Sequence, residues 1–439
     1  KFNPFVPSTF VFPENVIVQF MKTNAGIYRY WGYGTAAIEA NFATQTQTYS
    51  PDGTDPLNLK WYNEFIQASR NGNIAQAFNR TTRSDAQLAP GYGTDDLPSN
   101  IYRLRLMDLL GIKYIINRSE NPISDKTFPI DRFKPVWQKD TWTIFENLKV
   151  TPRFFLTTDV AGYTDANDFE RKFFNASNST TKVLLHNSDI ANLPVLSGEN
   201  HTVSLESYTL TKIVFSTNTD GNQVLFISDT YNNGWKATVD GNETNIYRAN
   251  WAFRAILVPS GNHTIIFNYS PQSFNIGVYI SIIGVAFLLI LYRYEKNKKL
   301  LSFTPLALII LIAFAFRFIL LDRIPNAITG DELVYPITAK SVVLTGHDMT
   351  GTWNIFQSLI FQYPPNQQQA ELPYFLHLPL SGLFPFSLLT AHLPFAILSV
   401  GIVILLYFIA QHLFGTQIAI ATGLVAAINP WLVVMGRTG

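Results

Sequence analysis

The chain has 439 residues, of which 47% are hydrophobic and 14% are charged, and its formal net charge is +1. A near-neutral chain lacks the basic excess that nucleic-acid binding requires, so we expect no nucleic-acid partner. It contains no cysteine, so disulfides are excluded and any exported domain must be stabilised by ordinary burial, which the length allows.

Residues 1–155 predict a mixed α/β region. Ile101–Leu110 has the pattern of a helix, and Lys113–Asn117 that of a buried strand. A further helix is expected over Asp165–Phe174, with Asp165 as its N-cap. Near the start, an aromatic cluster has two interpretations, a sugar-stacking platform or a core strand. Its members are Tyr28, Tyr30, Trp31 and Tyr33.

Residues 156–272 predict a small antiparallel β-sandwich. Short runs rich in β-branched and aromatic residues alternate there with turn dipeptides. The runs are Lys212–Ser216, Gln223–Ser228, Trp235–Val239, Ala252–Val258 and Thr264–Tyr269, and the turns are Asp220-Gly221, Asp240-Gly241 and Ser260-Gly261.

Four apolar runs predict membrane-spanning helices. Each is near the ~17–25 residues that cross a hydrocarbon layer about 30 Å thick, and helices satisfy their own backbone groups there. The runs are Ile276–Tyr292 (a span over 275–292), Pro305–Leu321, Leu393–Ile409 and Ile418–Val434. A fifth run, Pro373–Leu389, carries three prolines, which favours a short interfacial or re-entrant helix over a crossing.

The flanks of the first span predict its orientation. Four basic residues follow it and none lies in Thr264–Phe274 before it, so the positive-inside rule places residues 1–274 outside the cell. The basic residues are Arg293, Lys296, Lys298 and Lys299. We therefore expect a multi-pass protein of the cell membrane, with a cytoplasmic linker at 293–303 and an exterior loop at 322–372.

The ends of the sequence suggest a piece of a longer polypeptide. It begins at Lys1 rather than Met, and it stops at Gly439 directly after a span. A missing signal peptide would then carry no meaning.

The exterior part resembles the C-terminal region of YfhO-type bacterial membrane proteins over most of residues 1–292. The motifs are Leu109–Ile116, Thr151–Phe155, Asn233–Gly241 and Tyr247–Arg254. The resemblance implies a glycosyltransferase of the membrane-embedded GT-C class that glycosylates surface polymers, with its own catalytic helices before Lys1.

Residues 304–439 are similar to the start of protein O-mannosyltransferase-like GT-C enzymes. The motifs are Gly330–Tyr335, Tyr363–Pro365, Leu413–Gly415, Asn429–Trp431 and Gly436-Arg437. The chain departs from that pattern at His392, where those families usually have Arg. The fold class expected is thus a multidomain membrane protein, with an exterior α/β plus β-sandwich part and a truncated helical GT-C-like bundle.

The second resemblance implies chemistry on a polyprenyl-phosphate sugar donor at the outer membrane face. Asp331 would be the base that takes the proton of an acceptor hydroxyl, on a surface glycan, lipid or protein. It is equally placed to be a solvated acid in the first turn of a helix. Glu332 is a second catalytic candidate, but Thr329–Glu332 also fits a capping box ahead of a helix through Val343.

Departure of a phosphate requires cations nearby, and Arg437 and Arg317 are the donor-phosphate candidates. The alternative for Arg437 is an interfacial anchor. Arg317 lies inside its span, where a charge must face protein or water, and acts in support. No cofactor is certain. His347 and Asp348 are candidates for a divalent metal ion, although a solvated loop explains them better.

A different class of function is also open. The β-sandwich of a non-catalytic surface protein would bind glycan or cell-wall polymer while the spans anchor it. Four spans exceed what an anchor needs, which favours the transferase. Glycoside hydrolysis needs two carboxyls facing across a bond, and adjacent Asp331 and Glu332 do not suggest it.

Overall fold

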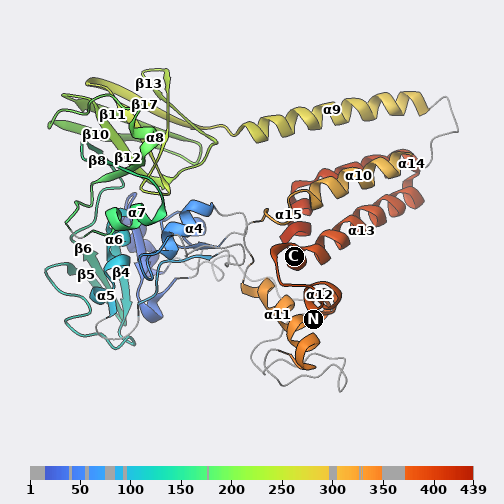
Figure 1. Cartoon of the computed structure of the whole chain (residues 1–439), viewed down its shortest axis with the longest axis horizontal. Coiled ribbons are helices and arrows are strands. Elements are labelled where there is room, and N and C mark those ends of the chain that lie inside the picture. Colours follow the sequence, from blue (N-terminus) through green and yellow to red (C-terminus); the bar gives the residue numbers. More distant parts are fainter. Residues whose placement is uncertain are drawn as a thin grey trace. The chain divides into compact units, whose positions relative to one another are not determined.

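The computed structural model describes most of the chain in two compact units, one ending at Phe274 and the other beginning at Asn275 (Figure 1). The described residues are 15–38, 42–54, 59–74, 85–91, 96–175, 177–295, 304–325, 328, 330–348 and 371–438. The division at Phe274 coincides with the expected end of the exterior part.

The first unit contains the expected mixed α/β region. Its sheet has the order β1-β4-β6-β5, in which β1 is parallel to β4 and the other pairs are antiparallel. The strands are β1 (Arg29–Gly32), β4 (Ile112–Arg118), β5 (Phe133–Lys139) and β6 (Trp142–Asn147), and β2 (Gly53–Thr54) pairs separately with β3 (Asp85–Ala86). The helices are α2 (Val16–Asn24), η1 (Gly34–Ala36), α3 (Phe42–Thr46), α4 (Lys60–Gln67), α5 (Asp96–Ser99) and α6 (Ile101–Leu109).

The aromatic cluster near the start is part of the core. Tyr30 and Trp31 on β1 are each 3% exposed, and Tyr33 is fully buried. Rings with no free face cannot stack on a sugar, so the core-strand interpretation is correct for these three residues, whereas Tyr28 is half-buried.

A βαβ unit follows, formed by β8 (Val160–Tyr163), α7 (Ala166–Phe173) and β9 (Val183–His186), with β8 and β9 parallel. The predicted cap is confirmed, because the Asp165 side chain accepts a hydrogen bond from the amide of Asp168 at 2.9 Å. A short helix, α8 (Asn187–Ile190), continues the chain toward the sandwich.

The β-sandwich is present as two sheets, of order β10-β11-β17-β13-β14 and β15-β16-β12-β7. Alternate residues of both sheets pack between them, among them Phe215, Leu225, Ile256 and Phe267. The strands are β7 (Phe154–Thr157), β10 (His201–Tyr208), β11 (Lys212–Thr219), β12 (Gln223–Thr230), β13 (Trp235–Val239), β14 (Asn242–Thr244), β15 (Tyr247–Ala249), β16 (Phe253–Val258) and β17 (Gly261–Tyr269).

The three predicted turns have different roles. Asp240-Gly241 closes the β13–β14 hairpin with positive φ at both residues, as a two-residue turn of type I′ requires. The chain at Asp220-Gly221 and at Ser260-Gly261 instead passes from one sheet to the other, because β11 and β12, and likewise β16 and β17, belong to different sheets.

One hydrophobic cluster extends across the predicted boundary at residue 155. Phe65 and Leu106, from the N-terminal region, pack in the same cluster as Val224, Phe226 and Phe253 of the sandwich. The helices and the second sheet therefore share a core.

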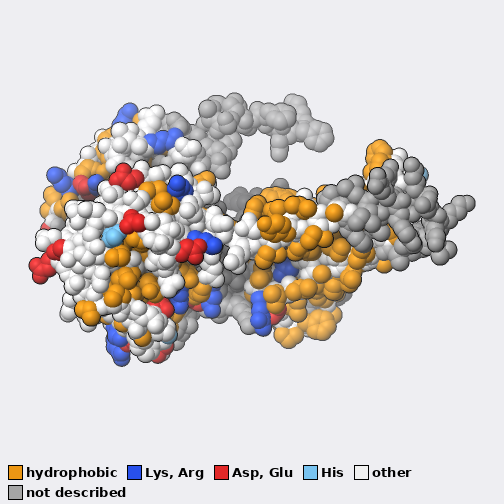
Figure 2. Space-filling view, turned by 90° about the horizontal axis from the view of Figure 1, so that it is seen from above, with side chains coloured by type: hydrophobic (Ala, Val, Ile, Leu, Met, Phe, Trp, Pro, Cys, Tyr) orange, Lys and Arg blue, Asp and Glu red, His pale blue; other side chains and the backbone are white. Residues whose placement is uncertain are grey.

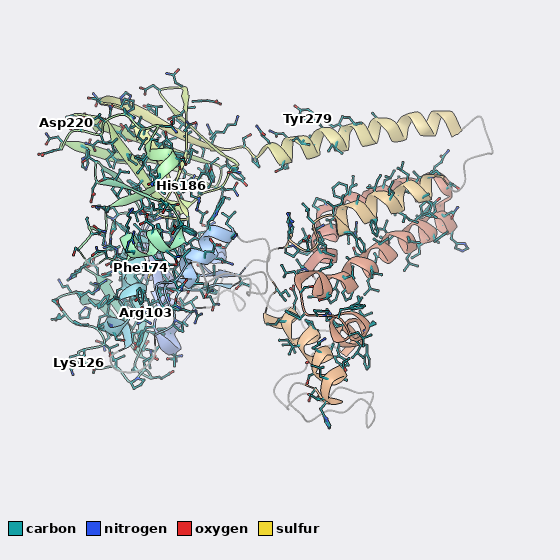
Figure 3. All side chains as sticks on the ribbon, viewed as in Figure 1. Arg103, Lys126, Phe174, His186, Asp220 and Tyr279 are labelled. Atoms are coloured by element: carbon teal, nitrogen blue, oxygen red, sulfur yellow. The ribbon has the colours of Figure 1, made fainter. Side chains whose placement is uncertain are left out.

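The second unit is helical. Its elements are α9 (Gln272–Glu295), α10 (Thr304–Phe318), α11 (Gly330–Thr345), α12 (Glu371–His377), the π-helix η2 (Leu378–Gly382), α13 (Leu388–Phe414), α14 (Thr416–Ile428) and α15 (Pro430–Thr438). By length and composition, α13 can cross a membrane, and α14 with α15 form a second candidate pair bent by 54°; α10 is a shorter apolar helix. The described part of α9 exposes apolar side chains such as Tyr279 (Figure 3). Four spans remain a prediction.

The proline-rich run does not form one continuous helix. Within Pro373–Leu389 the chain forms the end of α12, then η2, and only reaches α13 at Leu388. Lys340 of α11 donates to the carbonyl oxygens of Gly382 and Phe384, each at 3.0 Å, which ties α11 to the end of η2.

Side chains in α13 are distributed as in a membrane helix. It buries small or polar residues such as Ala391, His392 and Ser399, whereas Leu405 and Phe408 are exposed. Figure 2 shows hydrophobic side chains over most of the visible described face of this unit. Large apolar side chains outside and polar ones inside suit a hydrocarbon solvent.

In the first unit, Asp229 is a buried carboxylate shared by three arginines. It pairs with Arg153, with Arg254 at 3.1 Å and with Arg29 at 3.7 Å, and it accepts a hydrogen bond from the Tyr208 hydroxyl at 2.9 Å. Burial alone would raise the pKa of this carboxyl, but the three guanidinium groups outweigh burial and lower the pKa to about 2. The cluster joins β1, β7 and both sheets of the sandwich.

We expect Asp229→Asn to destabilise the first unit by about 3–5 kcal/mol, because it leaves buried guanidinium groups without their counter-charge. A depressed pKa stabilises the fold above the unfolded value of about 4 and loses that contribution as pH falls toward 2. The difference in melting temperature between wild type and variant should therefore narrow below about pH 4.

The measurement is thermal unfolding of the full chain in detergent across that pH range, followed by tryptophan fluorescence. Glu206→Gln, which neutralises an exposed carboxylate on β10, is the matched control and should change little. Equal melting temperatures for wild type and Asp229→Asn at pH 7 would contradict the role assigned to the cluster.

Candidate functional site

The elements that carry the candidate residues meet at one end of the helical unit. Leu333, one residue beyond Glu332 in α11, packs with Leu388 and Ala391 at the start of α13. Arg437, near the end of α15, donates to the carbonyl of Ile324 after α10. The starts of α11 and α13 and the ends of α10 and α15 are therefore neighbours.

Asp331 occupies the first turn of α11, which begins at Gly330. Its side chain, like Thr329, lies outside the described residues. Glu332 is half-buried. The helix continues to Thr345, close to the predicted end at Val343, so the backbone is placed as expected while the capping box remains a prediction.

Arg317 is explained by the break between α14 and α15. Pro430 has no N–H, so the carbonyl of Ala426 loses its partner, and the bend frees that of Ala427 as well. Arg317 donates to both, at 3.2 Å and 2.8 Å, from a fully buried position on α10. Its guanidinium therefore supplies the hydrogen bonds that the proline removes.

Ser399 of α13 completes this junction. Its hydroxyl oxygen accepts from Arg317 Nε at 2.7 Å, and the hydroxyl donates to the carbonyl of Leu432 at 3.2 Å. A Cβ on Gly436 would stand 2.3 Å from the same hydroxyl. Glycine at this position thus lets α15 pack directly against α13.

Arg437, on α15, caps the end of α10. It donates to the carbonyl oxygens of Phe316 at 2.8 Å, Ile319 at 3.0 Å and Ile324 at 3.2 Å, which are orphan acceptors at and after the end of α10. A cation at a helix C-terminus also complements the helix dipole. Arg317 on α10 therefore caps the end of α14, and Arg437 on α15 caps the end of α10.

Within the described part of the chain, both arginines pair with neutral groups and neither forms an ion pair with a carboxylate. Among the described residues, carbonyl and hydroxyl groups therefore hold these cations in place, and no carboxylate neutralises them. Such a region favours an anionic group nearby. Most of their N–H donors are used by the backbone, so their direct contact with a phosphate remains a prediction.

Two histidines at this end, His377 and His392, are buried, which the sequence did not predict. His392 is 1% exposed and interacts electrostatically with Arg437. His377 Nδ1 lies 3.1 Å from Ser381 Oγ, which in turn donates to the carbonyl of Thr390. Their burial could not be inferred from an apolar run interrupted by prolines.

The metal candidates do not assemble with other ligands in the described regions. His347 Nδ1 lies 3.1 Å from the carbonyl of Thr345, and Asp348 is buried. No group of three or more His, Cys, Asp or Glu side chains suitable for a metal occurs among the described residues. Their role as metal ligands therefore stays a prediction.

One comparison with known proteins gave a match. The model of a family described as bacterial membrane protein YfhO matches residues 194–281. No curated protein and no solved structure matches the chain. The matched segment begins before β10 and ends within α9, so it contains most of the sandwich and the first part of the following helix. It is narrower than the resemblance over 1–292, and the similarity of residues 304–439 to mannosyltransferase-like enzymes stays a prediction.

We expect Arg317→Met to lower the stability of the helical unit by several kcal/mol, because each buried carbonyl left without a donor costs about 1–3 kcal/mol. Pro430→Ala in the same chain should recover part of the loss, since the new N–H can donate to the Ala426 carbonyl. The measurements are protein level in membranes and melting temperature in detergent.

Arg323→Met is the matched control, because that arginine is exposed and, among the described side chains, its ion-pair partner is Asp322 at 3.5 Å. If Arg317→Met behaves like Arg323→Met, the capping role of Arg317 is wrong. If Pro430→Ala gives no recovery, the freed carbonyls are not the source of the loss.

Proposed function

We propose that the protein is a membrane glycosyltransferase that passes a sugar from a polyprenyl-phosphate donor to a hydroxyl of a surface glycan, lipid or protein at the outer face. The family matched at residues 194–281 is a membrane protein family associated with glycosyltransferase-like function. The distribution of side chains in α13 supports a bilayer setting.

The observation that carries the proposal is the positive charge of Arg317 and Arg437, two buried cations in the same helical unit as Asp331. Both guanidinium groups are buried and bonded to neutral oxygens. Asp331 stands at the first turn of α11. In the proposed site, the carboxylate is the base for the acceptor, and the two cations provide an environment for a phosphate leaving group.

In the proposed step, Asp331 accepts the proton of the acceptor hydroxyl from a distance of about 2.6–3.2 Å. The hydroxyl oxygen bonds to the anomeric carbon as the bond to the phosphate oxygen breaks, and the sugar configuration inverts. Polyprenyl phosphate departs with the electron pair. The fields of Arg437 and Arg317 stabilise the charge that develops on it.

Glu332 has a smaller part in the proposal. It is half-buried. It lies one residue after Asp331, still in the first turn of α11, where a carboxylate also stabilises the helix N-terminus. We assign it to positioning the first turn of α11 and Asp331 within it. A change at Glu332 should therefore affect stability together with transfer.

We expect Asp331→Asn to reduce sugar transfer by about 100-fold or more, as loss of a general base usually does, at unchanged protein level. The assay is transfer of radiolabelled sugar from polyprenyl-phosphate donors to membrane acceptors, with the protein in its own membranes. Asp322→Asn, an exposed acid on the same connection, is the matched control and should retain transfer. Normal transfer by Asp331→Asn would refute the assignment of the base.

The proposal also requires that the first unit face the outside. The chain has no cysteine, so a single introduced thiol reports its side of the membrane. We expect Leu210→Cys, at a site 95% exposed on the sandwich, to react with an impermeant maleimide in intact cells. His412→Cys, in the last turn of α13, should react only after permeabilisation. The opposite labelling pattern would show that the first unit faces the cytoplasm and would contradict the predicted orientation.

A further inference from the structure

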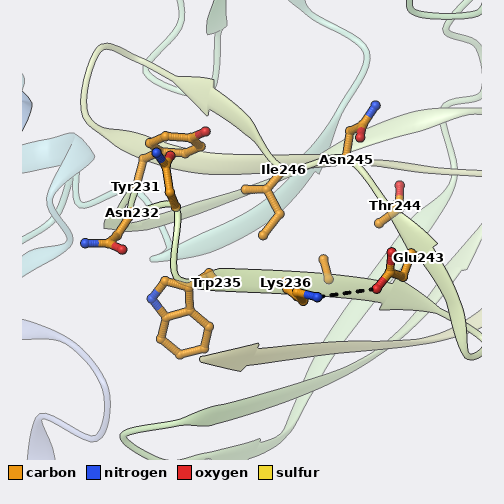
Figure 4. Close-up of a pocket in the computed structure, with 10 residues that line it drawn as sticks. Tyr231, Asn232, Trp235, Lys236, Glu243, Thr244, Asn245 and Ile246 are labelled. Carbon is orange, nitrogen blue, oxygen red and sulfur yellow. Dashed lines mark ion pairs between the residues drawn. The ribbon is translucent and has the colours of Figure 1, made fainter. Parts of the chain in front are cut away.

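An open groove lies on the β-sandwich where two connections cross between its sheets. Tyr231–Gly234 joins β12 to β13, and Asn245 and Ile246 join β14 to β15, so each connection passes from one sheet to the other. The cavity has a volume of about 230 Å³ (Figure 4). It lies inside the segment matched by the family model.

Uncharged polar groups, mostly side-chain amides, contribute much of the lining of this groove. Asn232, Asn233 and Asn245 contribute amides and Thr244 a hydroxyl, while Tyr231 supplies an aromatic ring. An amide presents both donors and an acceptor, which matches pairs of neighbouring hydroxyl groups. A ring face beside such groups suits the apolar face of a sugar.

The charges in the groove cancel. Lys236 lies 3.8 Å from Glu243, and both side chains are exposed (Figure 4). A strongly anionic polymer would meet Glu243, and a cationic one would meet Lys236. A neutral ligand rich in hydroxyl groups avoids both costs and can still hydrogen-bond to either group.

Residues that line the groove are fixed by contacts with the rest of the sandwich. The Trp235 ring stacks against the Arg254 guanidinium at 4.2 Å, and Arg254 is itself fixed by Asp229. The Asn232 side chain accepts from the amide of Gly234 at 2.8 Å, and a Cβ on Gly234 would stand 2.6 Å from the Tyr269 ring. A preformed site loses little entropy when a ligand binds.

We propose that this groove binds a segment of a neutral saccharide chain, making the sandwich a glycan-binding domain in its own right. The open form suits a stretch within a longer polymer rather than an enclosed single sugar. Binding depends on residues of the first unit alone, so it goes beyond the proposed transfer reaction and does not require it.

The test is fluorescence anisotropy of the full chain in detergent with labelled linear hexasaccharides of glucose, galactose, mannose and N-acetylglucosamine, and with anionic oligogalacturonate. We expect at least one neutral probe to bind. Asn245→Ala should weaken it about fivefold to tenfold, as loss of one hydrogen bond does. Asn262→Ala, an exposed asparagine on β17 outside the groove, is the matched control and should leave binding unchanged.

Tyr231→Ala provides a second groove variant, and Asn245→Ala keeps the test valid if loss of the Tyr231 contact with Trp61 unfolds the protein. The inference is overturned if no neutral probe binds, if oligogalacturonate binds more tightly, or if Asn245→Ala binds like wild type. Asp331→Asn should bind the saccharide normally. If the protein binds saccharide but transfers no sugar, the glycan-binding inference is supported and the proposed transfer reaction is refuted.

Discussion

The missing N–H of Pro430 is the constraint on which the helical unit depends. In a bilayer, a carbonyl freed by a proline has no water to bond to, so protein must replace the lost donor. Arg317 does so from another helix. Arg437 likewise donates to carbonyl oxygens left free at the end of α10. The bend between α14 and α15 and the burial of Arg317 are consequences of one backbone defect.

The first unit solves a similar problem in a different way. Its buried arginines surround a carboxylate, and Asp229 cancels part of their charge while it connects both sheets to β1. In the described helical unit, Arg317 and Arg437 have only carbonyl and hydroxyl partners. Charge is neutralised where the structure is a scaffold and left in place where a phosphate is proposed to act.

The sequence predicted those features that local pattern determines. Alternation and turn dipeptides located most strands of the sandwich, and Asp165 was identified as a cap because its partner is three residues away. It could not show that Asp220-Gly221 and Ser260-Gly261 join different sheets, since a turn dipeptide looks the same in a hairpin and in a crossover. The groove depends on two further crossovers and was missed for that reason.

The candidate site shows the same limit, because contacts between distant residues leave no local pattern in the sequence. Asp331 and Arg437 were identified by motif, and helix packing brings their elements to one end of the unit. The capping role of Arg317 could not be predicted, because the two carbonyls that it caps lie more than 100 residues away and are freed by a proline on another helix. An apolar run containing one arginine signals a cost without naming what offsets it.

The kind of partner each arginine has also bears on the proposed chemistry. A carboxylate in a direct ion pair with Arg437 would cancel much of the field that the arginine exerts on a phosphate. Carbonyl oxygens hold the guanidinium in position while leaving its net charge intact. The arginine can then stabilise charge that appears only as the sugar leaves, without movement of its own, which is the form of electrostatic assistance that lowers a barrier most.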